Sequence, residues 1–162
     1  MNLYDTITIQ ELQDYDTLVT EKANVIGRII QITTRGKVNH SGSYYRGNMY
    51  EADSTGFHDS TLLSFLEGCK KCYVLRPSFK VDKQTFYHRL KETMGKPYYF
   101  LGLLYNLIRQ FSGKWYGGES TDAFMCSQAS MYLLNEEQWW LFTPSDIKDY
   151  TKKFDIYELI MW

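Results

Sequence analysis

The sequence predicts an α+β protein with short strands in its first half and helices in its second half. Its 162 residues suffice for one domain, so 1–162 is predicted to be a single domain. Hydrophobic residues at 44% and charged residues at 23% are typical of a chain that folds around a core. Strand-like alternation precedes residue 76 and the strongest helical patterns follow residue 83. This segregation is typical of α+β folds.

Four elements are predicted in residues 16–52. Weak alternation over 16–20 predicts a strand. Apolar residues at helical spacing predict a helix over 24–33, whose first residue, Asn24, is a favourable N-cap. Two strand-like runs, 38–45 and 48–52, flank the turn residues Arg46 and Gly47 and predict a β-hairpin.

The middle of the chain is predicted to form a short helix over 60–66 and a strand over 72–75, which Pro77 would end. Residues 83–94 have helical periodicity, and Gly95 is a suitable C-terminal residue for that helix.

Three further helices are predicted in the second half. Residues 99–111 are apolar on most sides, which predicts a buried helix. Residues 125–134 form a second apolar helix, and 143–146 have the Thr-Pro-Ser-Asp pattern of a helix start.

The composition excludes several classes of function. With 18 basic and 19 acidic residues the net charge is −1, which argues against bulk electrostatic binding of nucleic acid or of an anionic membrane. The longest apolar run is about half of the ~20 residues that a spanning helix needs, so no stable membrane insertion is expected. The first residues lack the features of a signal peptide, which predicts a cytoplasmic protein as synthesised. Neither a phosphate-binding glycine loop nor a zinc quartet is recognised, so no cofactor and no metal are expected.

Cys126 is the strongest candidate nucleophile. It lies where a polar loop gives way to an apolar helix. At a helix N-terminus the macrodipole and the unpaired backbone amides favour the reactive thiolate. A buried core cysteine is the alternative.

The predicted hairpin supplies a candidate base. If Arg46 and Gly47 form the turn, Gly42 pairs with Glu51, and His40 becomes a diagonal neighbour of Glu51 on the same face. A carboxylate that orients a histidine, together with a thiol, makes a thiol-hydrolase site. A slip of one residue in the register would separate the two side chains.

Cys69 and Cys72 form a lone Cys-x-x-Cys pair. Zinc would need four ligands, and the pair runs into a strand-like segment, whereas a thioredoxin-type site opens a helix. The pair is therefore predicted to be structural, with a redox function as the weaker alternative.

The same segments resemble a known family. Residues 38–45 and 49–52 resemble the His-Val-Gly-Ile-Tyr hairpin of papain-like NlpC-type amidases, and 16–19 resembles the strand that precedes it. Residues 95–98 and 124–127 resemble the Gly-x-Pro-Tyr and Cys-Ser-Gly segments of that family. Here the histidine precedes the cysteine, which is the order of the circularly permuted branch that includes the YiiX-like amidases and, more distantly, lecithin retinol acyltransferase relatives.

The resemblance implies a permuted papain-like fold with a small antiparallel sheet packed against helices. It also implies Cys126 as nucleophile, His40 as general base, Glu51 as the residue that orients His40, and Tyr98 as a donor near the oxyanion. Gln128 departs from the acidic residue that this branch often has there.

The sequence therefore predicts a cysteine amidase or peptidase without a cofactor, whose substrate is a peptide, a peptidoglycan fragment or an acyl amide. A lipid acyltransferase or a thioesterase is an alternative function, because both would use the same cysteine chemistry. A non-catalytic binding module on the same fold stays open, with Trp139 and Trp140 as interface anchors or as core residues. The oligomeric state is left open.

Overall fold

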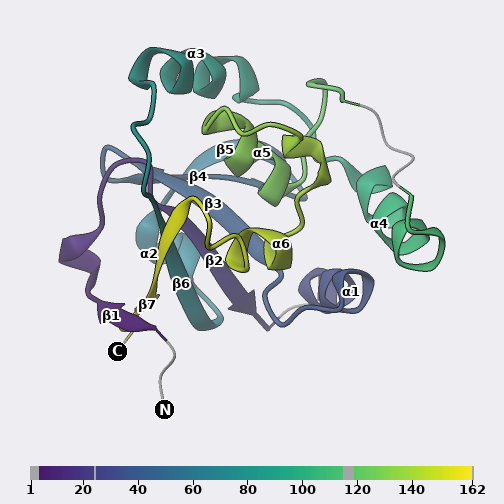
Figure 1. Cartoon of the computed structure of the whole chain (residues 1–162), viewed down its shortest axis with the longest axis horizontal. Coiled ribbons are helices and arrows are strands. Elements are labelled where there is room, and N and C mark those ends of the chain that lie inside the picture. Colours follow the sequence, from purple (N-terminus) through teal and green to yellow (C-terminus); the bar gives the residue numbers. More distant parts are fainter. Residues whose placement is uncertain (1–3, 24, 115–118, 162) are drawn as a thin grey trace.

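A seven-stranded sheet organises the part of the chain that this computed structural model describes, residues 4–23, 25–114 and 119–161 (Figure 1). Its strand order is β1-β7-β6-β2-β3-β4-β5. The strands are β1 (Asp5–Ile7), β2 (Thr17–Lys22), β3 (His40–Tyr45), β4 (Asn48–Asp53), β5 (Gly56–Thr61), β6 (Cys69–Pro77) and β7 (Phe154–Leu159). The helices are η1 (Ile9–Glu11), α1 (Val25–Thr34), α2 (Leu62–Leu66), α3 (Lys83–Thr93), α4 (Phe100–Ser112), α5 (Cys126–Leu133), η2 (Trp139–Leu141) and α6 (Pro144–Lys148).

The predicted hairpin is confirmed together with its register. In the β3–β4 ladder Tyr45 pairs with Asn48 and Gly42 pairs with Glu51. Arg46 and Gly47 connect the strands with φ values of 51° and 84°. Two consecutive positive φ values give the tight turn whose twist matches that of paired strands.

The predicted strand over 16–20 and the helices over 24–33, 83–94, 125–134 and 143–146 are also confirmed, each shifted by a residue or two. Asn24, the predicted cap of the first helix, lies outside the described residues. Asp82 caps α3 by accepting hydrogen bonds from the backbone of Gln84 and Thr85. The Thr143 side chain caps α6.

The prediction of a small antiparallel sheet is wrong in size and in one pairing. The C-terminal strand β7 returns after the last helix and lies between β6 and β1, antiparallel to β6 and parallel to β1. The sheet is therefore mixed. A third strand of the meander, β5, occupies part of the predicted 60–66 helix, of which only Leu62–Leu66 is helical. The predicted 72–75 strand extends over all of β6.

The sheet is covered on both faces, and alternate residues of the central strand β2 contribute to two core clusters. Leu18 belongs to the cluster that includes Met49 and Phe65. Val19 belongs to the larger cluster that includes residues of α5. α5 packs against β3 and β4, which places its N-terminus beside the hairpin.

The burial predicted for residues 99–111 is wrong. α4 forms as expected, but Leu101, Leu104 and Phe111 are 58%, 51% and 81% exposed. The reason is that α4 buries only one face, which packs against α1 and, through Leu103 and Asn106, against the edge of the larger core cluster (Figure 1). Among the described residues no helix is both long and apolar enough to cross a membrane.

Candidate active site

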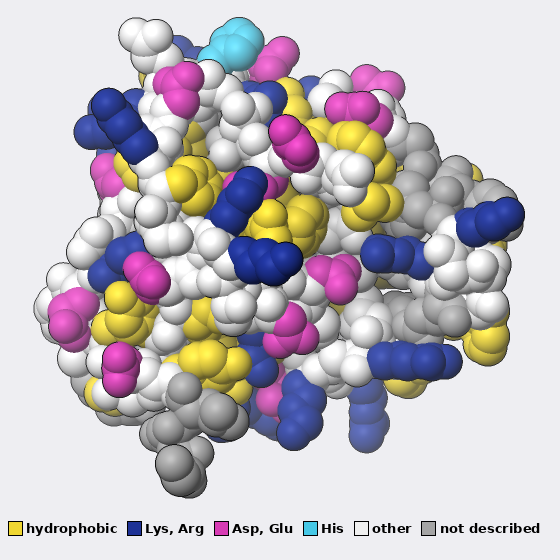
Figure 2. Space-filling view, in the orientation of Figure 1, with side chains coloured by type: hydrophobic (Ala, Val, Ile, Leu, Met, Phe, Trp, Pro, Cys, Tyr) yellow, Lys and Arg dark blue, Asp and Glu magenta, His cyan; other side chains and the backbone are white. Residues whose placement is uncertain are grey.

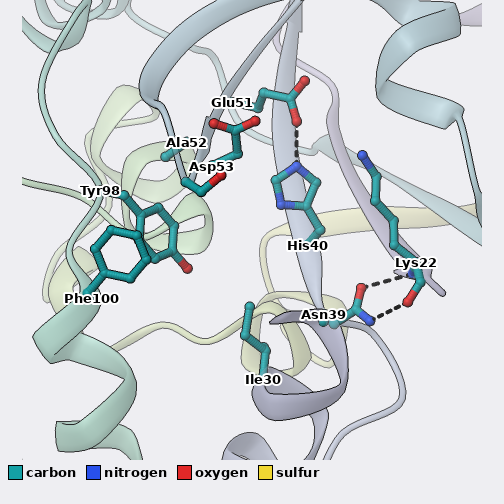
Figure 3. A pocket seen from close by; sticks show the side chains of 11 residues that line it. Lys22, Ile30, Asn39, His40, Glu51, Ala52, Asp53, Tyr98 and Phe100 are labelled. Atoms are coloured by element: carbon teal, nitrogen blue, oxygen red, sulfur yellow. Dashed lines mark hydrogen bonds and ion pairs between the residues drawn. The ribbon is translucent and has the colours of Figure 1, made fainter. Parts of the chain in front are cut away.

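The hairpin brings His40 and Glu51 into contact, as its predicted register requires. The His40 Nε2 atom lies 2.5 Å from Glu51 Oε2, and both side chains are largely buried (Figure 3). This contact uses one ring nitrogen and leaves Nδ1 for another partner.

Ser60 completes the environment of Glu51, and the sequence interpretation missed it. Its hydroxyl donates to Glu51 Oε1 at 2.5 Å, so both carboxylate oxygens are held. Ser60 lies in β5, where it pairs with Met49 and is therefore a diagonal neighbour of Glu51. Because 60–66 was predicted to be helical, this neighbour could only have been found by interpreting 56–61 as a third strand.

Cys126 is the first residue of α5, as predicted. The preceding turn is fixed by Gln128, whose side-chain oxygen accepts from the Met125 N–H at 3.1 Å and whose amide donates to the Trp140 carbonyl at 2.8 Å. The Ser127 hydroxyl donates to the Phe142 carbonyl at 2.7 Å. An amide can donate and accept at once, which an ionised carboxylate in the place of Gln128 cannot do. Gln128 thus positions the start of the helix.

Cys126 and His40 lie close enough to interact, and each shifts the titration of the other. Burial raises the pKa of the Cys126 thiol, but the hydrogen bond and the charge of His40, followed by a backbone hydrogen bond from Ser41, bring that pKa below its ordinary value. Burial lowers the pKa of His40, and its bonds to Cys126 and Glu51 outweigh burial and raise that pKa to about 9. The geometry therefore favours a thiolate–imidazolium pair.

The Glu51 carboxylate is stabilised in its charged form. Burial raises its pKa, while the hydrogen bond and charge of His40, the hydrogen bond from Ser60 and the charge of Lys22 lower it to about 2. An ionised Glu51 next to His40 stabilises the imidazolium, and it fixes the orientation of the ring.

Tyr98 lies beside Cys126 because its segment is bonded to the residues that precede α5. Tyr98 forms a parallel bridge with Phe124, and the Phe124 N–H donates to the Pro97 carbonyl at 3.2 Å. Burial, followed by the negative charge of Cys126, raises the pKa of Tyr98 well above its ordinary value. The hydroxyl, which points into the pocket in Figure 3, therefore stays protonated and able to donate.

His40, Glu51 and Tyr98 border a cavity of about 170 Å³, whereas Cys126 is buried behind them and does not line it. The sheet contributes polar side chains to it, and helices α1 and α4 close one side with Gly27, Ile30 and Phe100 (Figure 3). The side chain of Asn39 holds the rim by accepting from the Lys22 N–H at 2.9 Å and donating to the Lys22 carbonyl at 2.8 Å. The other lining residues are His40, Glu51, Ala52, Asp53, Ser54 and Tyr98.

The remaining sequence candidates lie elsewhere. Cys69 and Cys72 are free thiols in β6, and burial raises the pKa of both, which makes them poor nucleophiles. Trp139 is a core residue that packs against the rings of Phe124 and Tyr132, so it is not an exposed interface anchor.

Comparisons with known proteins show the fold of the chain. No protein-family model and no curated protein sequence match it. Among solved structures it is similar to the crystal structure of YiiX from Escherichia coli O157:H7, described as a metalloprotein and as DUF1105, with a TM-score of 0.55. The two share 19% identity over 75% of this chain and 63% of that chain. The chain has a YiiX-like fold, and it spans less than two thirds of the length of that neighbour.

That neighbour is described as a metalloprotein. Within the described ranges no group of three or more His, Cys, Asp and Glu side chains could hold a metal ion. His40 and Glu51 are hydrogen-bonded to each other, and His40 also interacts with Cys126. These residues do not fit a metal site.

Proposed function

We propose that this protein is a cysteine hydrolase of the amidase or peptidase type, built on a circularly permuted papain-like (NlpC-type) fold. The observation that carries the proposal is the buried hydrogen bond between His40 and Glu51 beside the buried Cys126 thiol, whose pKa the interaction with His40 lowers. A thiol at a helix N-terminus, activated by an oriented histidine, is the arrangement that covalent acyl transfer requires. The permuted assignment is supported by the chain order, since His40 and Glu51 precede Cys126.

In the acylation step the Cys126 thiolate attacks the carbonyl carbon of an amide or ester. The carbonyl oxygen becomes an oxyanion, which the Cys126 N–H and the Tyr98 hydroxyl stabilise in this mechanism by donating hydrogen bonds. The His40 imidazolium then donates its proton to the leaving nitrogen or oxygen as the bond to carbon breaks, and the product is a thioester on Cys126.

In the second step neutral His40 takes a proton from water, and the resulting hydroxide attacks the thioester carbonyl. The acid leaves and the thiolate–imidazolium pair is restored. An alcohol or amine in place of water gives acyl transfer, so an acyltransferase differs from the amidase only in the acceptor of the acyl group. A thioesterase differs from the amidase only in the acyl donor, which is a thioester.

The pocket supports small acyl donors with polar groups. Lys22 and Asp53 line it with opposite charges, which suit the carboxylate and ammonium groups of a peptide or a peptidoglycan fragment. Phe100 and Ile30 supply an apolar side that suits an acyl-amide chain.

Turnover of a panel of peptide amides, acyl amides and esters tests the proposal. Wild type should hydrolyse at least one class, Cys126→Ala should lose that activity while still unfolding in one cooperative transition, and Cys69→Ser should retain the activity as the matched thiol control. Activity that survives in Cys126→Ala would contradict the mechanism. A folded protein that turns over none of the panel and whose Cys126 thiol is no more reactive than a free thiol would instead be a non-catalytic binding module.

A further inference from the structure

An apolar stripe faces outward along α4. Leu101, Leu104 and Phe111 recur at helical spacing and are exposed, and Phe100 beside them is 54% exposed. A surface helix normally presents polar residues to water, whereas a helix that is apolar all round belongs in a core or in lipid. Exposed apolar surface of this kind marks an interaction site.

The segments that form and flank α1 and α4 have a local excess of basic residues, although the whole chain has a net charge of −1. Residues 22–50 and 96–118 contain basic residues and no Asp or Glu. Arg109 of α4 is paired with Asp146 of α6 at 3.9 Å, so this pair adds no net charge to the surface. The exposed basic residues of these segments include Arg28, Arg35, Lys37 and Lys114.

The two features occur on adjoining helices. α1 and α4 pack against each other, and α1 adds the exposed Ile29 next to Arg28. Figure 2 shows dark blue Lys and Arg side chains with yellow hydrophobic ones on the side where Figure 1 places α1 and α4. Apolar side chains that enter the acyl boundary and cations that meet anionic headgroups are the two components of interfacial membrane binding.

We propose that the α1–α4 surface docks the protein on an anionic phospholipid membrane. The bound helices would lie in the plane of the headgroups, which is compatible with their short length. Because Gly27, Ile30 and Phe100 of the same helices line the catalytic pocket, docking would bring that pocket to the membrane surface. The inference goes beyond the proposed hydrolase activity and does not depend on it.

Sedimentation with vesicles tests the docking, with Cys126→Ala protein used beside wild type so that turnover plays no part. Both proteins should bind vesicles of phosphatidylcholine mixed with phosphatidylserine far more tightly than vesicles of phosphatidylcholine alone. Arg28→Gln/Arg35→Gln should weaken binding roughly 20-fold, since each cation near such a surface contributes about fivefold. Leu101→Ser/Leu104→Ser should weaken it at least about tenfold through lost apolar burial.

Matched controls place the same changes elsewhere on the surface. Leu63→Ser removes a side chain of α2 that is 77% exposed, and Lys70→Gln/Lys80→Gln removes two other exposed cations. Both controls should bind vesicles like wild type, and unfolding melts should show all variants folded. Equal losses in controls and test variants, or no vesicle binding by wild type, would overturn the proposal. A dimer that Leu101→Ser/Leu104→Ser dissociates, without vesicle binding, would show that a second copy covers the stripe.

Discussion

Replacing His40 with alanine should make Cys126 react with iodoacetamide more slowly than a free thiol at neutral pH. In the native site, burial raises the pKa of the Cys126 thiol, and the interactions with His40 are the main cause that lowers this pKa. Without His40 the effect of burial is opposed chiefly by Ser41. The alkylation profile of His40→Ala should therefore move to higher pH.

The size of the effect follows from the fraction of thiolate. A free thiol with a pKa near 8.5 is about 3% ionised at pH 7, so ionisation favoured by an imidazolium partner can raise the thiolate fraction by at most roughly 30-fold. Stabilised thiolates are weaker nucleophiles, which offsets part of this gain. A net rate difference of about tenfold or more at pH 7 is expected, since burial suppresses the thiolate further in the variant.

The assay follows the mass increase of the protein on alkylation, with Cys69 and Cys72 replaced by serine to remove the background. Glu51→Gln is the graded control, because a neutral amide still accepts the imidazole N–H but no longer stabilises its charge. Its profile should lie between those of wild type and His40→Ala. Coincident profiles for wild type and His40→Ala would refute the assignment of His40 as the partner of Cys126.

Further predictions concern stability and positioning. His40, with its pKa raised from 6.5 to about 9, contributes stability that is complete below pH 6.5 and is lost as the pH rises toward 9. Glu51, with its pKa lowered from 4.5 to about 2, contributes stability that is present above pH 4.5 and is lost as the pH falls toward 2. Urea unfolding across this range should show both losses, and His40→Ala should lack the alkaline one. Ser60→Ala should cost about 1–3 kcal/mol of unfolding free energy and lower kcat more than it changes KM, since it frees one Glu51 oxygen; an unchanged kcat would count against this positioning. Leu18→Ala, in the middle of the sheet, should cost about 2–5 kcal/mol in urea unfolding, while the exposed Leu63→Ala should change stability by less than about 0.5 kcal/mol; similar costs would contradict the assignment of the core.

The parts of the site that could be predicted from the sequence depend on local rules. The turn at Arg46 and Gly47 sets the register of β3 and β4, and that register alone places His40 next to Glu51. The position of Cys126 at a helix start follows from a polar loop that gives way to an apolar helix. Both inferences need only the geometry of one hairpin and one helix.

The parts that could not be predicted depend on distant segments. β7 pairs with β1 and β6, which are distant from it in the sequence. Without knowledge of these two partner strands, the residue pattern of β7 does not show that it belongs to the sheet. β5 has few apolar residues, so its pairing with β4, and hence the bond from Ser60 to Glu51, is hidden in the sequence. The exposure of α4 was missed because an apolar helix is normally buried.

Intact-protein and peptide mass spectrometry during turnover of an activated ester or acyl amide tests the proposed nucleophile most directly. The account predicts an acyl group attached through a thioester to the peptide that carries Cys126, formed faster than it is released and absent in Cys126→Ala. Turnover without an adduct, or an adduct on Cys69 or Cys72, would contradict the assignment of Cys126 as the nucleophile.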